Sequence, residues 1–514
     1  MLRNNEELSR ILKLCEGDEI SRFGKLFKTT NSCYFYDTGT SKVILLDEDT
    51  YKLLLELMNS DSINQEKYVN SKTQGELELL DEFLYCSKTE NLFRAFKPDR
   101  LCGRLHNEDL ENQIGSNIKQ LILEVTGICN LRCGYCIYNE SYEGNREFNS
   151  KIMSRKIAFK GIDYLEKHGG EEVAVTFYGG EPLLQYDLVK ACIEYAKEKL
   201  SGRKLSYSLT SNLTLMTEER ATYFASVDNM SIVCSIDGPK RIHDSYRKYP
   251  NGEGSFEAAL VGLKNLIMAY GEKASKNISI NIVYAPPYTY EKLEEINAFF
   301  EQLEWLPEDV RIDITYAADG SVDDKESVEE LMSDESYLTE QGTFNPLYLW
   351  GKDKFLKKGK GLISKSGIEG MLLKIHKRDI YKMPIPAYPF NACCVPGARR
   401  LYITTDGEML VCERVGNSPS IGNVFDGINL EKIKKHYIED YSKYSSEECK
   451  KCWAIRLCER CYVGNYNKDG FYNKRLHEQC EEMRMYVERE LSYYHEINET
   501  TPEDLDYLNR IEIS

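Results

Sequence analysis

The segment 121-LILEVTGICNLRCGYC-136 joins an apolar, strand-like run to three cysteines at uneven spacing. Three residues separate Cys129 from Cys133, and two separate Cys133 from Cys136. A structural zinc site needs four ligands in closed tetrahedral geometry, but no further Cys or His occurs between 137 and 167. Three thiolates can instead hold three corners of one iron–sulfur cubane and leave one iron open for a chelating ligand. The spacing therefore predicts such a cluster.

Apolar runs and helical stretches alternate between residues 121 and 317. The strand candidates are LILEV, EVAVTFYG, LSYSLTS, MSIVCSID, ISINIVYA and VRIDITYA, and the helical stretches lie near 151–168, 186–200, 217–226, 255–270 and 289–303. This alternation predicts an α/β fold with a parallel sheet. Six units are too few for an eightfold barrel, so we expect an open sheet or partial barrel, with its chemistry at the C-terminal strand ends. The three cysteines follow the first strand at that end.

The charge and cysteine content of the chain exclude several classes of function. The 514 residues carry 66 basic and 83 acidic side chains, a formal net charge of −17. Nucleic acid needs a basic footprint, so we expect no nucleic-acid partner. We find no secretory h-region and no apolar run long enough to span a bilayer, so we expect a cytoplasmic protein without a membrane partner. Seventeen cysteines in such a chain indicate metal binding or catalysis rather than a disulfide framework.

Composition and pattern divide the chain into five expected parts. They are a winged-helix-like module (1–112), the α/β unit (113–318), a charged bridge (319–392), a cysteine-rich extension (393–490) and an acidic C-terminal tail (491–514). In the module, CYFYD and KVILL around TGTSK predict a β-hairpin. Asp47 or Asp49 can cap a helix that begins near Thr50, and QGELELLDEFLYC predicts a second helix. The bridge is acidic in its first half and basic in its second.

The motif CNLRCGYC resembles the CxxxCx(aromatic)C loop of radical S-adenosylmethionine (SAM) enzymes. The resemblance implies a partial (β/α)6 radical SAM barrel with a [4Fe–4S] cluster on Cys129, Cys133 and Cys136. The amino and carboxylate groups of SAM would chelate the open iron. An electron from a donor such as flavodoxin or ferredoxin would cleave SAM to a 5′-deoxyadenosyl radical, which abstracts hydrogen from the substrate.

Other strand ends carry segments similar to those of the same family. FYGGEP, after the second strand, resembles the GGEP motif that meets the SAM methionine group, although a Gly–Gly pair is also common in turns. SIDGPKRIHDSYR, after the fourth strand, resembles a second family segment that ends here at Arg247. Tyr135 lies near adenine by resemblance, or else packs the loop, and Asn212 stands where many relatives have TNG. The resemblance implies SAM contacts from Tyr135, Gly179, Gly180, Glu181, Pro182, Asn212, Ser235 and Asp237.

A second cysteine pattern begins at residue 394. Twelve residues separate Cys394 from Gly407, and four separate Gly407 from Cys412. A CxxCx5CxxC run over 449–461 and a final Cys480 follow. The pattern resembles the seven-cysteine SPASM extension, which implies two auxiliary [4Fe–4S] clusters and three in all.

The family's ligation can be transferred to these positions. The first auxiliary cluster would take Cys394, Cys412 and Cys461, and the second would take Cys449, Cys452, Cys458 and Cys480. Two residues separate the last CxxC pair, where the family usually has three, so the assignment of Cys461 departs from the pattern. Cys393 either completes the first cluster or is a bystander. A zinc ribbon is the alternative, but its CxxC pairs are usually roughly 15–20 residues apart.

SPASM enzymes commonly modify peptides or proteins. The N-terminal module resembles the recognition element of ribosomal-peptide maturases, which binds a precursor's leader by strand addition; the alternative is a structural cap. We therefore expect a maturase that crosslinks a precursor peptide, for example by a thioether. Anaerobic sulfatase maturases are the nearest alternative, and they carry an Asp after the cysteine matching Cys412. Here this position is Glu413, either a base or a solvated carboxylate. A non-catalytic metal- and peptide-binding protein is the alternative from another class.

Overall fold

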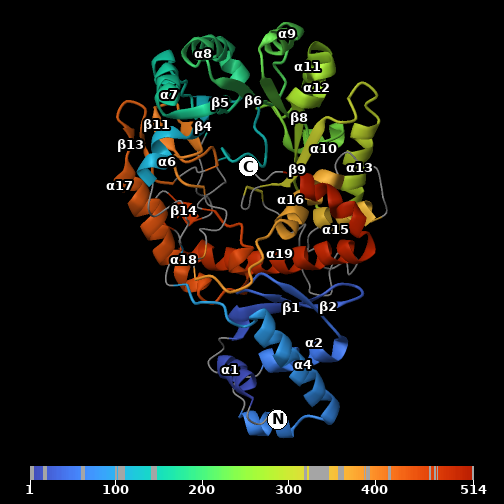
Figure 1. Ribbon diagram of the computed structural model, residues 1–514. Coiled ribbons are helices and arrows are strands. Elements are labelled where there is room, and N and C mark those ends of the chain that lie inside the picture. The colour runs from blue at the N-terminus through green and yellow to red at the C-terminus, as the bar shows by residue number, and fades with distance from the viewer. Residues whose placement is uncertain are drawn as a thin grey trace.

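The computed structural model describes residues 5–15, 20–59, 64–98, 101, 110–139, 148–317, 321–322, 346–356, 364–386, 388, 394–414, 418–461, 465–467, 470–471 and 473–511. Figure 1 shows three levels, with an α/β sheet at the top and the N-terminal module at the bottom. Between them lie the helices α15 (Pro346–Leu356), α16 (Ser364–His376) and α19 (Asn473–Thr500). Cys393 and most of the acidic half of the bridge lie outside the described residues.

The central sheet contains the six parallel strands that the sequence predicts. Its order is β13-β12-β11-β10-β4-β5-β6-β7-β8-β9. The predicted strands are β4 (Ile118–Thr126), β5 (Gly169–Gly179), β6 (Lys204–Ser211), β7 (Met230–Ser235), β8 (Ile278–Tyr284) and β9 (Arg311–Tyr316), and each is parallel to the next. The connecting helices include α7 (Arg155–His168), α8 (Tyr186–Lys199), α9 (Glu218–Ser226), α11 (Phe256–Tyr270) and α13 (Tyr290–Glu301). The predicted parallel α/β sheet is confirmed.

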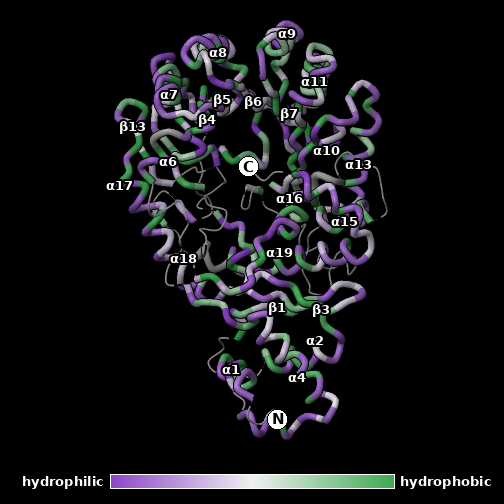
Figure 2. Tube along the Cα trace, viewed as in Figure 1, coloured by the Kyte–Doolittle hydropathy of each residue, from purple (hydrophilic) through white to green (hydrophobic). Residues whose placement is uncertain are grey.

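Local sequence explains where these helices begin. The side chains of Ser154, Thr217 and Thr289 each accept a backbone N–H three residues on, at the starts of α7, α9 and α13. Figure 2 shows hydrophilic and hydrophobic residues alternating along the outer helices α8 and α9, as expected for helices with one face on a sheet.

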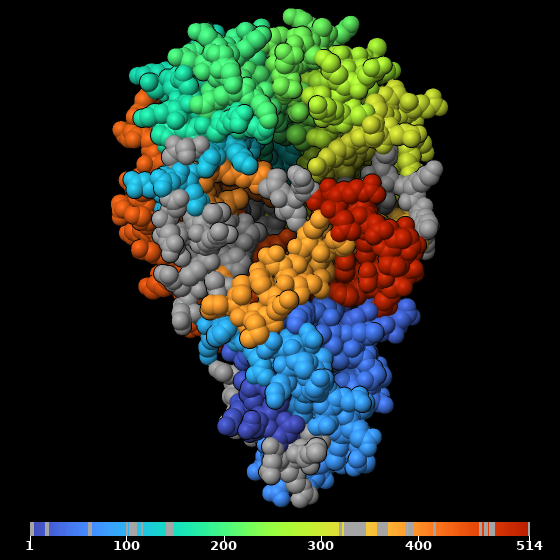
Figure 3. Space-filling view, in the orientation of Figure 1, coloured from blue at the N-terminus to red at the C-terminus, as the bar shows by residue number. Residues whose placement is uncertain are grey.

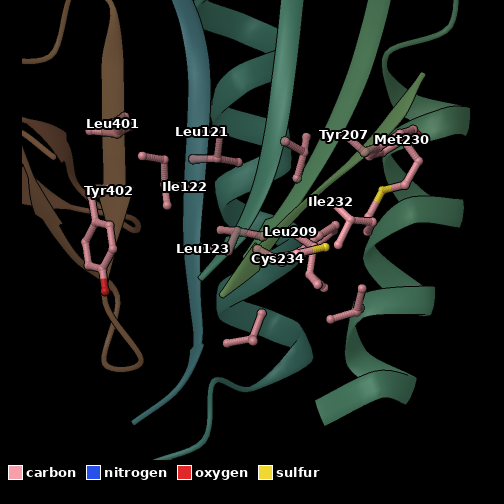
Figure 4. Close-up of a cluster of buried hydrophobic side chains, with 14 of the residues drawn as sticks. Leu121, Ile122, Leu123, Tyr207, Leu209, Met230, Ile232, Cys234, Leu401 and Tyr402 are labelled. Atoms are coloured by element: carbon pink, nitrogen blue, oxygen red, sulfur yellow. The ribbon is translucent and has the colours of Figure 1, made fainter. Parts of the chain in front are cut away.

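The two faces of the sheet differ in polarity. In β6, Tyr207 and Leu209 are buried in the core formed with the helices, whereas Ser206, Ser208 and Thr210 point to the other face and are half-buried. The strands β7 and β8 alternate in the same way. Figure 4 shows part of the apolar core. A sheet with both faces covered would have nearly continuous apolar strands, so this alternation leaves one face of the sheet polar and partly open.

Four strands of the cysteine-rich extension join the same sheet. They are β10 (Arg400–Ile403), β11 (Glu408–Leu410), β12 (Gly422–Asn423) and β13 (Gly427–Ile428). Strand β10 lies parallel to β4, with Tyr402 opposite Ile122, and Figure 4 shows Leu401 and Tyr402 beside β4. Gly407 forms the β10–β11 turn with φ +88°, a conformation that favours glycine. The sheet therefore continues across the domain boundary that the sequence predicts at residue 393. Strand β10 of the extension pairs with the edge of β4.

The N-terminal module is an antiparallel sheet with helices on one face. It contains α1 (Glu6–Cys15), β1 (Gly24–Lys28), β2 (Cys33–Asp37), β3 (Val43–Leu46), α2 (Glu48–Met58) and α4 (Gln74–Glu90), with the strand order β1-β2-β3. The predicted hairpin is present as β2 and β3, and the Asp47 side chain caps α2 by accepting the N–H groups of Asp49 and Thr50. Strand β1 was not predicted.

The C-terminal helix differs from the expected tail. Helix α19 continues through the expected boundary at residue 490, and Leu491, Ile497, Leu505 and Leu508 are buried. Residues 491–511 therefore have an apolar face, which packs into the middle level, as well as acidic side chains. Within the described ranges, no helix combines the length and the apolar character that crossing a bilayer requires.

Candidate active site

The three-cysteine loop lies at the C-terminal end of β4, as predicted. Backbone hydrogen bonds pin it to the segment after α10 (Lys240–Tyr246): Arg132 N donates to Lys248 O at 2.7 Å and Gly134 N donates to Tyr246 O at 3.0 Å. Gly134 packs under the Tyr246 ring, where an added Cβ would lie 3.1 Å from Cδ1. The segment that resembles the second family motif therefore holds the cysteine loop through Tyr246.

The three thiols of this loop form one electrostatic group. Burial raises the pKa of Cys129 and Cys133 to about 12. Negative charge on Cys136 or Cys129 also raises the pKa of Cys133. Burial also raises the pKa of Cys136. Thiols with pKa values raised in this way are protonated at neutral pH, and iron binding would displace the protons. Among the described residues, no three Cys, His, Asp or Glu side chains lie close enough to surround a single metal ion.

The Gly179–Gly180 pair allows β5 to approach the backbone that leads into the cysteine loop. Gly179 has φ +134°, and a Cβ there would lie 2.2 Å from Thr126 O. A Cβ at Gly180 would lie 2.2 Å from Ile128 O. Gly180 N donates to Thr126 O at 2.8 Å. The close approach that the sequence assigned to a ligand is, in this structure, an approach to the neighbouring chain segment.

Glu181 is buried and binds protein groups at the end of β6. Its carboxylate accepts from Leu183 N at 3.0 Å, from the Ser211 hydroxyl at 2.9 Å and from Asn212 N at 2.8 Å. Burial raises the pKa of Glu181 to about 7, against these hydrogen bonds, which lower it. Pro182 follows at the start of a short 3-10 helix, Pro182–Gln185. Glu181 therefore ties the ends of β5 and β6 together.

Asn212 lies beside the first cysteine of the loop. Its Nδ2 donates to Asn130 Oδ1 at 3.0 Å and lies 3.9 Å from Cys129 Sγ. Its Oδ1 accepts from the Thr214 hydroxyl at 2.7 Å, and Asn130 Nδ2 donates to the same hydroxyl at 2.8 Å. This network orients Asn212 toward the cysteine loop. The sequence predicted a SAM contact at Asn212 and did not identify Asn130 or Thr214.

Asp237 is the centre of a buried network behind the loop. It accepts from Arg247 Nε at 2.8 Å, from Val283 N at 3.0 Å and from the Tyr135 hydroxyl. The Arg247 guanidinium also lies over the Tyr135 ring, 5.4 Å from its centroid, and lowers the pKa of Asp237 against the effect of burial. These contacts give Tyr135 the loop-packing role that the sequence left as an alternative.

The predicted residue Ser235 lies on the polar face of the sheet. It is at the end of β7 and pairs with Asn281 of β8, which pairs with Asp313 of β9. Figure 3 shows a hollow below the α/β level, on the side away from the outer helices. Small hydroxyl and amide side chains thus lie on the polar face of the sheet at the ends of these strands.

The four cysteines predicted for the second auxiliary cluster converge on one cavity. Cys449, Cys452, Cys458 and Cys480 all line this cavity. Arg460 and Arg484 also line this cavity, and Arg460 Nη1 donates to Cys480 Sγ at 3.1 Å. The guanidinium charges offset the negative charge that bound thiolates would bring. The sequence did not identify either arginine, since a nearby positive charge has no fixed spacing from a cysteine.

The remaining predicted ligands are only partly brought together. Negative charge on Cys412 or on Cys461 raises the pKa of Tyr437, so both thiols lie near the Tyr437 hydroxyl. Cys394 is exposed just before β10. Cys393 lies outside the described residues. No disulfide joins the cysteines of the described ranges.

The predicted base Glu413 follows Cys412 and is largely buried. Its Oε1 lies 3.6 Å from Arg400 Nη1. Its Oε2 is buried without a hydrogen-bond partner among the described residues. An unpaired buried carboxylate oxygen is unusual, so Glu413 is not a solvated carboxylate.

Comparisons with known proteins agree with the geometry of the sheet and loop. Residues 123–300 match the Radical SAM superfamily. The chain is 26% identical over 396 residues to the cysteine-type anaerobic sulfatase-maturating enzyme of Clostridium novyi, covering 73% of this chain and 96% of that one. It is 25% identical over 258 residues to the radical SAM cyclopropyl synthase TigE of Paramaledivibacter caminithermalis, covering 46% of this chain and 52% of that one.

The fold is also that of a solved structure. Native anSMEcpe with bound AdoMet matches with a TM-score of 0.52 and 20% identity, over 77% of this chain and 100% of that chain. Two further curated relatives, 31% and 36% identical, match over 44% and 48% of their own length, so the chain spans about half the length of these relatives. The strand order and the cysteine loop thus agree with the similarity of residues 123–300 to the Radical SAM superfamily.

Proposed function

We propose that this chain is a radical SAM peptide maturase, which abstracts hydrogen from a ribosomally made precursor peptide. One observation carries the proposal: the cysteine loop, the Gly179–Gly180 pair and the Asp237 network meet at one end of a sheet with a polar, partly open face. A reactive group bound at the loop would face a substrate held in that hollow. We place the protein in the cytoplasm, with flavodoxin or ferredoxin as the electron donor.

The chain's own residues suit SAM and its cluster. Cys129, Cys133 and Cys136 would hold three irons, and Asn212 would orient a ligand on the fourth from its place beside Cys129. We propose Ser235 and the segment Gly179–Pro182, at the ends of β7 and β5, as further SAM contacts. When bound and reduced, this cofactor supplies a 5′-deoxyadenosyl radical.

Two auxiliary [4Fe–4S] clusters complete the proposed cofactors. Cys449, Cys452, Cys458 and Cys480 share one cavity with two arginines, which favours a negatively charged cluster over a neutral core. Cys412 and Cys461, near Tyr437, would hold the other cluster together with Cys394.

The N-terminal module supplies a site for a leader peptide. Strand β3 pairs with β2 on one side, and no described strand pairs with its other side. Leu45 on β3 is 65% exposed. An extended leader would add to this edge through backbone hydrogen bonds, with its side chains reading the surface around Leu45.

The proposed product is a thioether crosslink. Forming this carbon–sulfur bond would remove a hydrogen atom from the target carbon, a proton from the thiol and one further electron, two hydrogens overall. The bound SAM and clusters would supply the hydrogen acceptor and the electron acceptor.

A second candidate function is oxidation of a Cys or Ser to formylglycine, as a sulfatase maturase. The match to a cysteine-type anaerobic sulfatase-maturating enzyme over 96% of its length favours it. Glu413 also favours it, because its buried, unpaired Oε2 is placed to accept a proton next to Cys412.

Anaerobic reconstitution tests the class of function. We expect about 12 irons per chain and reductive cleavage of SAM. Zinc without iron, and no SAM cleavage, would instead indicate a non-catalytic metal- and peptide-binding protein. Co-expression with a short cysteine-containing peptide encoded beside the gene, followed by mass spectrometry, then separates the two substrates. A crosslink that survives alkylation supports the peptide maturase, and formylglycine in a co-expressed sulfatase supports the alternative.

A further inference from the structure

The sheet of the N-terminal module is covered on both faces. Leu26 and Phe35 point to the module's own helices. Phe27, Tyr34 and Tyr36 point the other way, into a core shared with α16 and α19. Figure 1 shows β1 and β2 directly beneath α19. The module is therefore docked through an apolar core, and it is not joined to the rest of the chain by a linker alone.

The docking platform includes the residues between two cavity cysteines. The segment from Cys452 to Cys458 contains a short 3-10 helix, Trp453–Arg456. Trp453 and Leu457 belong to the core shared with the module, and the Trp453 ring lies 6.0 Å from that of Tyr36. Ala454 belongs to the same core and also lines the cysteine cavity. One short segment thus separates the module from the cavity.

Buried hydrogen bonds fix this segment to the module. The Thr38 hydroxyl donates to Trp453 O at 2.9 Å, and Arg456 Nε donates to Thr38 O at 2.7 Å. The side chains of Thr38 and Trp453 are both buried. Thr38 follows β2 directly, so the end of that strand is tied to the residue next to Cys452.

Helix α19 makes the same connection from a second direction. It carries Cys480, which lines the cavity. Further along the same helix, Glu488 pairs with Lys25 of β1 at 2.8 Å, and Glu499 accepts from the Tyr34 hydroxyl at 2.5 Å. Three of the four cavity cysteines, Cys452, Cys458 and Cys480, therefore lie on segments that the module contacts.

We propose that the N-terminal module positions the cysteines of the second auxiliary site. Thr38, acting through Trp453 and Arg456, is a positioning residue that holds Cys452 and Cys458 in place, so module docking and cluster binding stabilise one another. The inference rests on the proposed cluster at Cys449–Cys480, and it is independent of which peptide the module binds. Coupling of this kind is reciprocal by thermodynamic linkage.

The first test measures the loss of iron from the reconstituted holoenzyme to a chelator. The kinetic phase that disappears in Cys480→Ala identifies this cluster. Thr38→Val removes the hydroxyl donor and keeps the side-chain shape, and loss of one such hydrogen bond corresponds to about a fivefold faster phase. Thr30→Val is the matched control, because Thr30 donates to Glu496 of α19 at an exposed position away from the cavity.

An unchanged phase in Thr38→Val would overturn the inference. If the wild-type protein lacks any Cys480-dependent phase, the proposed auxiliary cluster fails, and the inference fails with it. The two failures are therefore distinguishable.

The second test needs no variant and covers the case in which Thr38→Val does not fold. Removing iron from the wild-type protein should increase hydrogen exchange in β1 and β2 severalfold, while α8 at the far end of the molecule stays unchanged. Electron paramagnetic resonance before removal confirms that the clusters were present. Equal exchange in β1 and β2 with and without iron would overturn the inference.

Discussion

The three-cysteine loop and the Cys449–Cys480 site hold their thiols in contrasting ways. The loop is eight residues long from Cys129 to Cys136, and backbone hydrogen bonds to Tyr246 and Lys248 fix it within one unit. The second site gathers its cysteines from separate segments, and two of these segments also support the N-terminal module. A local site depends on nearby sequence alone, whereas a dispersed site depends on how distant parts of the chain are docked.

Removing the loop thiols should have the largest effect and should leave the dispersed site intact. In Cys129→Ala/Cys133→Ala/Cys136→Ala we expect SAM cleavage to fall to background and iron to fall from about 12 to about 8 per chain. Iron analysis and quantification of 5′-deoxyadenosine check this. Cys86→Ala, in the N-terminal module, is the control and should change neither quantity. Loss of all iron in the triple variant would show that the two sites do not assemble independently.

Breaking the buried pair behind the loop should have the next largest effect. Asp237→Asn leaves the buried Arg247 guanidinium without a charged partner, which costs about 3–5 kcal/mol of unfolding free energy. Urea unfolding measures it. The exposed pair Arg311–Asp313 provides the control, since Asp313→Asn should change the free energy by about 0–1 kcal/mol. Equal effects of the two substitutions would contradict the buried role of Asp237.

Acid should weaken both regions through buried histidines. Burial lowers the pKa of His243, behind the loop, and of His495, on α19 beside Tyr34 of the module, from 6.5 to about 4 in each case. Between pH 6.5 and pH 4 each histidine is protonated in the unfolded chain and neutral in the folded protein. The folding stability that is present above pH 6.5 is therefore lost as the pH falls toward 4. At pH 5 the loss is about 2 kcal/mol per histidine relative to pH 7.

Hydrogen exchange at pH 7 and pH 5 separates the two histidines. His495→Leu should remove the acid-induced increase in β1 and β2 and leave that of the 246–248 segment unchanged. If the increase in β1 and β2 persists in His495→Leu, another group is responsible.

Removing one surface contact of the module should have the smallest effect. Lys25→Gln deletes the partly exposed pair with Glu488, for which we expect about 0.5 kcal/mol or less, declining at high salt. Thermal unfolding at low and high salt measures it, with Lys204→Gln at the exposed Glu172 pair as the control. A much larger effect of Lys25→Gln would mean that charge, and not the apolar core, docks the module.

Features that depend on short-range pattern could be predicted from the sequence. The strands β4 to β9 alternate with capped helices, so the strands and the place of the cysteine loop after β4 could be predicted. The pairing of β10 with β4 could not be, because the two strands are far apart in the chain and nothing in a short strand specifies a distant partner. For the same reason Glu181 was assigned to a ligand, while two of its three hydrogen-bond donors come from Ser211 at the end of β6 and from Asn212, the residue after it.

One missed feature did leave a signal. The run CYFYD in β2 is buried at every position. A continuous apolar run of this length is typical of a strand covered on both faces, and its second cover is the platform around Trp453.

The pairing of β10 with β4 also limits how this chain can be rearranged. Four residue pairs, from Arg400–Gln120 to Ile403–Leu123, join the parallel strands β4 to β9 to the C-terminal extension. A chain cut before residue 394 would expose the edge of β4 and invite self-association through unpaired backbone groups. The extension therefore cannot be exchanged between relatives as a separate cassette, and a working chimera would need to carry this strand register with it.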